Sequence, residues 1–287
     1  MAKGRELKGR IKSVENTKKI TRTLEMVATS KMKRAQERVM AARPFADVLT
    51  EVISSLYSSE LAERFPLLRQ PASVRRAAVL VLTANRGLAG AFNSNILREA
   101  RGVLARLSSE NVETELHVVG RKGLGYFRFA GRAVTSSRTD ITDRPTVDDA
   151  AQLVDGLMAR FASGELDAVY VVSAKFKSAL STPPHTETVL PVTPPERKGP
   201  LPDYLLFPSA DAILSELLPL YVRNAVYRGL VENEAGFQSS QRNAMKNATD
   251  NAGEILNVLR RTYNRARQAQ ITQEIAEIVG GSAALEG

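Results

Sequence analysis

Apolar and small side chains recur in steps of three and four along the first 56 residues. This spacing is the seam of a coiled coil rather than the wider apolar stripe of a helix on a globular domain. Pro44 interrupts the segment, but the pattern resumes in phase after it, so we expect a kink and not a helix end. The seam positions, with one step skipped at Lys18, are Leu7, Ile11, Val14, Thr21, Leu24, Ala28, Met32, Ala35, Val39, Ala42, Ala46, Leu49, Ile53 and Leu56.

The C-terminal segment carries the same spacing, which predicts a second helix from about Ser209, through Pro219, to Gly280 and Gly281. About 70 helical residues span on the order of 100 Å, too long for the inside of a compact domain, so we expect this helix to project and to pair with the first. Its predicted seam positions are Ala244, Ala248, Ala252, Ile255, Leu259, Thr262, Ala266, Ala269, Gln273, Ala276 and Val279.

The middle of the chain alternates between two other patterns. AAVLVLT (residues 77–83), TELHVVG (114–120) and DAVYVVSA (167–174) are typical of strands, and amphipathic helical stretches occupy 93–107 and 147–162. This alternation predicts an α/β layer of mostly parallel, Rossmann-like strands. Pro-rich loops, STPPH and VTPPERKGPLP, should return the chain to the last helix. We therefore predict a helix in residues 1–60, an α/β domain in 74–208 and a helix in 209–287.

Composition and charge narrow the possible functions. The chain has no Cys, which excludes disulfides and thiolate chemistry, and it has neither a signal-like apolar segment nor 18 consecutive apolar residues. We therefore expect neither secretion nor membrane insertion. Residues 1–43 hold 13 Lys/Arg against 4 Asp/Glu, which accounts for the whole net charge of +9. Such a basic helix faces nucleic acid, an anionic membrane or acidic protein surfaces.

The candidate catalytic motifs are weak. TANRGLAGAFN (residues 83–93) is a Gly-rich turn between a strand and a helix, but it matches neither a dinucleotide fingerprint nor a P-loop. A structural turn is favoured there, as is a solvated turn for the basic GRKG segment at 120–123. His117 and His185 have no partners at ligand spacing, and Asp148 and Asp149 fit helix capping. We predict no catalytic residue, cofactor or metal.

Two alternatives stay open at this point. A nucleotide-dependent α/β enzyme with helical arms would bind ATP or a dinucleotide. A coiled-coil nucleic-acid binder would use the basic first helix, but its cations surround the helix and its seam runs through the basic part. This disfavours nucleic acid as a partner.

Several motifs together resemble the gamma subunit of F-type ATP synthases. KGRIKSVENTKKITRTLEMVATSKMKRAQ (residues 8–36) is similar to that family's N-terminal signature, and ITQEIAEIVGG (271–281) to its C-terminal one. NRGLAGAFN (85–93) and NAMKNATDNA (243–252) match a domain loop and the C-terminal helix. The resemblance covers the chain in the right order. Gln241-Arg242 displaces a common family Arg by one position, and the Cys-bearing chloroplast insertion is missing, which favours a bacterial-type protein.

The resemblance implies a non-catalytic rotor. In that family the terminal helices form an antiparallel coiled coil inside a hexamer of alpha and beta subunits, and the α/β domain lies against the epsilon subunit and the c-subunit ring. It implies a peripheral location on the cytoplasmic face of the inner membrane, without direct insertion. The implied hexamer-contacting residues are Lys18, Lys19, Arg22, Met26, Lys31, Arg34, Arg267, Gln268, Thr272, Glu274, Ile275, Ile278 and Val279. The implied rotor-foot residues, facing epsilon and the ring, are Asn85, Arg86, Gly87, Leu88, Asn93, Arg121 and Lys122.

Overall fold

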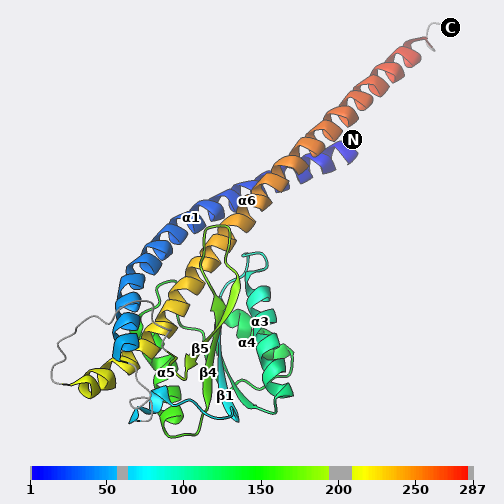
Figure 1. The fold of residues 1–287 in the computed structure, drawn as a ribbon. Coiled ribbons are helices and arrows are strands. Elements are labelled where there is room, and N and C mark those ends of the chain that lie inside the picture. The colour runs from blue at the N-terminus through cyan, green and yellow to red at the C-terminus, as the bar shows by residue number, and fades with distance from the viewer. Residues whose placement is uncertain (1, 57–63, 194–208, 284–287) are drawn as a thin grey trace. The chain divides into compact units, whose positions relative to one another are not determined.

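The computed structural model describes residues 2–56, 64–193 and 209–283, with a long helix near each end of the chain and an α/β region between them in sequence (Figure 1). Helix α1 spans Ala2–Leu56 and helix α6 spans Ala210–Ala283, and the predicted helices therefore run through Pro44 and Pro219. The elements between them are η1 (Pro66–Leu68), β1 (Arg76–Leu82), α3 (Phe92–Ser109), β2 (Glu113–Val119), α4 (Arg121–Phe129), β3 (Ser136–Arg138), α5 (Val147–Ala162), β4 (Ala168–Ala174) and β5 (Pro184–Leu190). The predicted fold class is confirmed.

The chain divides into two compact units, each of which contains part of both long helices. The helical unit comprises residues 1–28 and 242–287, and the sheet unit comprises residues 29–241. Among the described residues, no helix is both long enough and apolar enough to cross a membrane.

In the helical unit, α1 and α6 pair antiparallel. The buried Thr249 hydroxyl donates to the Thr21 hydroxyl at 2.8 Å, and further along Arg260 Nη2 lies 2.6 Å from Glu15 Oε1. Small side chains at the contact allow the two backbones to approach closely, so less apolar area is buried per residue than in a Leu-rich seam.

The seam of α6 differs from the predicted one. The structure buries Met245, Thr249, Ala252 and Leu256, whereas the predicted seam residue Ile255 is 51% exposed and Leu256 only 5%. The predicted register was wrong by one position at Met245, Thr249 and Leu256, whereas the predicted seam residues Ala252, Leu259 and Ala266 are buried or half-buried. An Ala-rich helix has no strongly apolar face, so its contact with α1 decides which side chains are buried.

The sheet of the other unit has the strand order β3-β2-β1-β4-β5, of which Figure 1 labels β1, β4 and β5. The first four strands are parallel, and β5 pairs antiparallel with β4. Every residue of β1 after Arg76 is buried, because helices cover both faces of a parallel sheet. One face packs against α3 and α4 around Phe92 and Phe127, and the other packs against α5 and the sheet-unit parts of α1 and α6 around Phe161 and Val226.

Three elements were missed in the sequence. Strand β3 has only three residues, β5 begins with Pro184 inside the predicted STPPH loop, and α4 begins at Arg121, where a solvated turn was expected. Short or Pro-containing edge strands carry little periodic signal, since they are not buried on both faces. The predicted VTPPERKGPLP loop lies largely outside the described residues.

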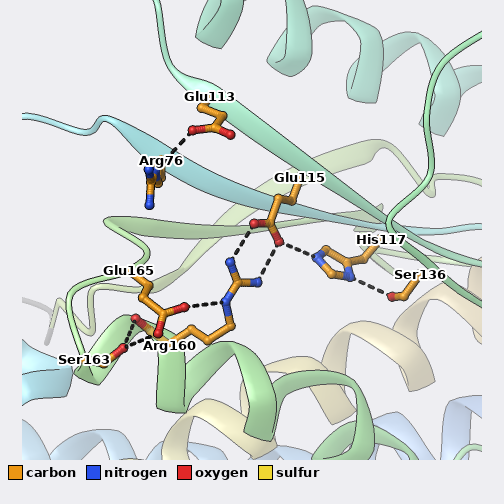
Figure 2. Close-up of polar contacts among 8 residues, drawn as sticks. All are labelled: Arg76, Glu113, Glu115, His117, Ser136, Arg160, Ser163 and Glu165. Carbon is orange, nitrogen blue, oxygen red and sulfur yellow. Dashed lines mark hydrogen bonds and ion pairs between the residues drawn. The ribbon is translucent and has the colours of Figure 1, made fainter.

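A polar cluster joins α5 to the sheet (Figure 2). Glu115 on β2 accepts two hydrogen bonds from Arg160 on α5, at 2.6 and 2.7 Å, and this pairing lowers the pKa of Glu115. His117 Nδ1 lies 2.7 Å from Ser136 Oγ, so a histidine that looked unremarkable in sequence ties the edge strand β3 to β2. Burial lowers the pKa of His117.

Within the sheet unit, α6 carries a row of polar residues that are mostly shielded from water. Gln238 Nε2 donates to Glu234 Oε1 at 2.7 Å, while Gln238 Oε1 is buried without a partner among the described residues. Burial raises the pKa of Glu234 to about 7, with Asp143 adding to the shift and Lys31 and Arg38 opposing it. A protonated Glu234 could donate its hydroxyl to the unpaired Gln238 oxygen after the amide turns over.

The pKa of Glu234 predicts how the free energy of unfolding depends on pH. Because the folded-state pKa of about 7 exceeds the ordinary value of 4.5, the folded chain binds more protons than the unfolded chain between these values. Stability should therefore fall as pH rises through this window, by up to about 3 kcal/mol. Glu234→Gln should remove that part of the pH dependence in urea unfolding of the full chain.

Glu216→Gln is the matched control, because Glu216 is exposed on the same helix and its replacement removes the same charge. This variant should keep the wild-type pH dependence. An unchanged stability-versus-pH curve for Glu234→Gln would contradict the shifted pKa.

Candidate interaction surfaces

The predicted hexamer-contacting residues Lys18, Lys19 and Arg22 line an open pocket of about 500 Å³ in the helical unit. Helix α6 supplies the opposite wall with Arg260, Gly253 and their neighbours. We call this the basic pocket. Arg260 is paired with Glu15, which leaves the other three cations to set the charge of the surface.

Gly253 shapes the basic pocket. A Cβ placed on it would lie 3.1 Å from Lys18 Nζ, so the missing side chain leaves room for the lysine to reach across α6. Lys18 is also the position at which the α1 seam skips a step. The skipped seam position at Lys18 and the glycine at 253 therefore lie opposite each other, and both line the basic pocket. The sequence of either helix alone does not reveal this pairing.

The predicted apolar tip of α6 is open to solvent. Every residue from 271 to 280 is exposed, including Ile278 at 71%. Ile271, Ile275, Ile278 and Val279 follow one another at helical spacing and form a single apolar stripe, which we call the apolar tip. Exposed stripes of large aliphatic residues are typical of interaction sites.

The remaining predicted hexamer residues of the helical unit differ in their surroundings. Met26, Arg267 and Gln268 are exposed. Thr272 donates its hydroxyl to the Gln268 carbonyl, and Glu274 accepts from Gln270 one turn away at 2.8 Å. The last two side chains therefore have roles within α6 itself.

In the sheet unit, Lys31 and Arg34 are not equivalent. Lys31 Nζ lies 2.8 Å from Asp143 Oδ2, and this ion pair lowers the pKa of Asp143. Arg34 is exposed and donates to the Ser30 hydroxyl on its own helix. Of the two, only Arg34 presents its charge without an ion pair among the described residues.

The loop of residues 85–93, predicted to belong to the rotor foot, is held from within by its asparagines. Asn85 Oδ1 accepts from Arg121 N at 3.0 Å, and Asn93 Oδ1 accepts from Ala84 N at 3.0 Å. Both asparagines are only partly exposed, so we assign them a structural role. They hold the loop in a conformation in which other residues of the loop are exposed.

Three residues at the ends of the two Gly-containing motifs, Thr83, Gly120 and Gly123, support this loop, a role that the sequence analysis did not assign to them. Thr83 Oγ1 donates to the Val119 carbonyl and accepts from Gly123 N at 2.9 Å. A side chain at Gly120 would overlap the Thr83 carbonyl oxygen, and its φ of 95° also requires glycine. Two glycines flanking the basic pair Arg121-Lys122 were the available signal for this close approach.

Of the predicted rotor-foot residues, the exposed ones are Arg86, Leu88, Arg121 and Lys122. Leu88 is 64% exposed and has a φ of 62°, a left-handed conformation that costs a non-glycine residue about 1 kcal/mol. Gly87 lies beside the Lys122 side chain. A strained, exposed leucine among three cations is typical of a binding loop.

The structure places this loop near one of the predicted hexamer residues. Asn85 Nδ2 donates to the Ile141 carbonyl at 2.9 Å, and Asp143, two residues on, pairs with Lys31. Two surfaces that the sequence assigned to different partners therefore share one end of the sheet unit.

Helix α6 fills the crevice in which open α/β sheets commonly bind ligands, outside the C-terminal ends of the strands where the strand order reverses. Here that point lies between β1 and β4. Asn233 accepts from Ala174 N at 3.2 Å, and Phe237 packs edge-on against Phe92 with ring centroids 5.8 Å apart. A Cβ on Gly236 would lie 3.1 Å from the Phe92 ring.

The Gln241-Arg242 pair, where the sequence differs from the family pattern, lies at the boundary between the two units. Both side chains are partly buried, and Arg242 Nη1 donates to Asn243 Oδ1 at 3.4 Å.

Comparisons with known proteins agree over the full length. The sequence model of the ATP synthase family matches residues 3–285. The chain is 68% identical to the ATP synthase gamma chain of Gemmatimonas aurantiaca over 100% of both chains, and 44% identical to that of Leptospira biflexa over 99% of this chain and 100% of the relative.

Solved structures are similar as well. In the Tetrahymena thermophila mitochondrial ATP synthase central stalk and c-ring, one chain is 26% identical, with a TM-score of 0.61, covering 80% of this chain and 99% of that one. A chain of the Euglena gracilis mitochondrial enzyme shares the fold at 20% identity, with a TM-score of 0.70 over 99% and 95% of the two chains.

Proposed function

The chain belongs to the ATP synthase family, with gamma chains as its relatives, and from that premise we propose that it is the central rotor shaft of an F-type ATP synthase. In this role it couples rotation of an ion-driven c-subunit ring to the conformational cycle of catalytic beta subunits. The observation that carries the proposal is the helical unit, whose paired helices present a basic pocket and, separately, an apolar tip.

A shaft of this kind acts through unequal contacts. Three chemically identical catalytic sites around one asymmetric object each meet a different face, so each experiences a different interaction free energy. The basic pocket belongs to only one side of the helix pair and provides such a difference. Because coupling free energies are reciprocal, nucleotide binding at the sites also biases the orientation of the shaft.

Acidic segments of the alpha and beta subunits are the partners that fit the basic pocket. Lys18, Lys19 and Arg22 supply its unpaired positive charge, and Gly253 keeps it concave. Contacts between opposite charges at an exposed rim contribute modestly to affinity and strongly to orientation and rate. That balance suits a contact that must be released and remade at every step.

The apolar tip fits a different partner surface. Ile275, Ile278 and Val279 offer apolar contact, which is non-directional, so an apolar sleeve around them would favour few angular positions. The tip would then act as a bearing at the end of the shaft.

We further propose that the chain is not itself catalytic and binds no nucleotide in its sheet unit. The crevice between β1 and β4 is occupied by Asn233, Gly236 and Phe237 of α6, at the position where a nucleotide-binding relative of this fold would hold its ligand. In the Gly-rich loop, the side chains of Asn85 and Asn93 accept hydrogen bonds from backbone N–H groups that support the loop.

The exposed foot residues Arg86, Leu88, Arg121 and Lys122 are proposed contacts to the epsilon subunit and the c-subunit ring. This assignment would place the chain peripherally, on the cytoplasmic face of the membrane that carries the ring. Lys31 lies at the same end of the sheet unit, so the hexamer is the competing partner for this surface.

Co-expression with alpha and beta subunits tests the proposed role. The chain should co-purify as one copy per hexamer and restore ATPase activity. Replacing the pocket cations in Lys18→Gln/Lys19→Gln/Arg22→Gln should weaken its association with the hexamer about tenfold at low salt, because exposed charge pairs contribute about 0.5 kcal/mol each.

The matched control is Arg5→Gln/Lys8→Gln/Lys12→Gln, which removes three exposed cations from the same helix outside the pocket. Its association should stay within about twofold of the wild type. Equal losses in the two triple variants would show that net charge matters and the pocket does not, and absence of the chain from the purified hexamer would sink the rotor assignment.

The same complexes test the bearing. Ile275→Ser/Ile278→Ser/Val279→Ser, and truncation from Ile278 onward, should lower the thermal stability of the assembly and its torque in single-molecule rotation, since apolar burial is lost. Gln273→Ser/Glu277→Ser, which changes exposed polar residues of the same turns, should leave both unchanged. Wild-type stability and torque in the truncated complex would refute the bearing.

Cross-linking tests the foot, because a chain without Cys allows clean single-cysteine variants. Leu88→Cys and Lys122→Cys, each combined with a photoactivatable reagent in the assembled enzyme, should yield products with epsilon or c subunits. Products with beta subunits alone would move this surface to the hexamer interface. Ser94→Cys, exposed on α3 just beyond the loop, is the control for non-specific labelling.

A further inference from the structure

The two faces of the sheet unit differ in charge. The layer formed by α3, α4 and their adjoining loops exposes a group of cations that form no ion pair with any described residue. These are Arg98, Arg101, Arg106, Arg121, Lys122, Arg128 and Arg132. On the α5 face, by contrast, the acidic residues Asp140, Asp155 and Glu165 each pair with an arginine. The α3–α4 layer therefore carries a dense group of cations without ion pairs among the described residues.

Within this basic layer, an open pocket of about 500 Å³ lies between α4 and the segment leading into β3. Arg128 and Arg132 line it together with the hydroxyl residues Thr135 and Ser137, and Leu124 contributes an apolar wall. Arg132 donates one hydrogen bond to Thr114 Oγ1 at 3.0 Å, which fixes the guanidinium and leaves further N–H donors free. The volume is within the range of small-ligand sites.

The backbone at this pocket is already satisfied. Gly131 N donates to the Arg128 carbonyl and Arg132 N to the Phe127 carbonyl, with Gly131 at a φ of 67°, which together make a Schellman motif at the end of α4. Carbonyl groups that would otherwise repel an anion at a helix C-terminus are thereby engaged. The motif also fixes the turn that separates the two arginines.

Phe129 stands next to this pocket in the chain and is 92% exposed. A large aromatic side chain that is left in water offers apolar area to a partner. Arginines and hydroxyls in the pocket, together with an exposed aromatic residue next to Arg128 in the chain, suit a ligand that joins an oxyanion to an apolar part. Arginine in particular binds phosphate through paired N–H donors.

We propose that the pocket under α4 binds a phosphate ester, with Arg128 and Arg132 on the phosphate and Phe129 against the apolar part of the ligand. Both a phospholipid headgroup at a membrane surface and a soluble phosphate ester present this chemistry. The site is separate from the basic pocket and the apolar tip, and the proposal does not depend on the rotor role.

The test uses the purified full chain and two probes. Flotation compares vesicles of phosphatidylglycerol and phosphatidylcholine with vesicles of pure phosphatidylcholine, and tests whether the ligand is a phospholipid headgroup. Calorimetric titration with glycerol 3-phosphate tests whether the ligand is a soluble phosphate ester. Arg128→Gln/Arg132→Gln should lower the affinity for the effective probe at least about tenfold, since two charge-assisted contacts are lost.

The matched control is Arg101→Gln/Arg106→Gln, which removes the same charge from exposed positions of the same layer and should change affinity by less than about twofold at physiological salt. Phe129→Ser should weaken vesicle binding and leave glycerol 3-phosphate binding unchanged. Circular dichroism of each variant verifies the fold.

Binding to anionic vesicles that depends on Arg128, Arg132 and Phe129 supports the lipid source, and arginine-dependent binding of glycerol 3-phosphate supports the soluble one. Equal losses in the two double variants would reduce the effect to general electrostatic attraction and overturn the site. Failure of both probes to bind the wild-type chain would overturn it as well.

Discussion

The structure depends on one helix meeting two different packing requirements. Up to Gln241, α6 packs in the sheet unit and buries large side chains such as Leu214, Leu218 and Val226. From Arg242 onward it pairs with the start of α1 and buries smaller ones such as Thr249 and Ala252. Both stretches belong to the single helix Ala210–Ala283, and each buries the side chains that its own unit requires. Glycines at 229, 236 and 253 mark three close approaches along it.

This use of α6 also explains how a Rossmann-like sheet can serve a mechanical role. The fold does not determine function, which resides in the groups placed at particular sites. Where the strand order reverses, between β1 and β4, Phe237, Gly236 and Asn233 of α6 fill the crevice in which this fold commonly binds a ligand. The same contacts that fill the crevice attach the long helix to the sheet.

The sequence was sufficient for the long helices and for the buried strands β1, β2 and β4, because strong periodicity or continuous apolar runs reflect burial directly. It was insufficient where the deciding contact is distant. Ile255 and Leu256 are equally apolar, and only the approach of α1 buries the second. Arg121 looked like part of a turn, yet Asn85 Oδ1 accepts a hydrogen bond from its backbone N–H, and Thr83 Oγ1 accepts one from Gly123 N, so this segment is held as the start of α4. Of the candidate site residues, exposed cations were recognisable by type, whereas the ion pair that engages Lys31 was not.

The Lys31–Asp143 ion pair is one contact on a path by which force could pass through the chain. Lys31 and Asp143, Ile141 and Asn85, and Asn85 and Arg121 form a chain of contacts from α1 to the start of α4, all within one compact unit. Spatial continuity alone does not establish coupling; it requires a two-state element biased from both ends. In a rotor that element would be the partner, whose sites change state, while in this chain the contacts form a continuous path from the loop of residues 85–93 to α1.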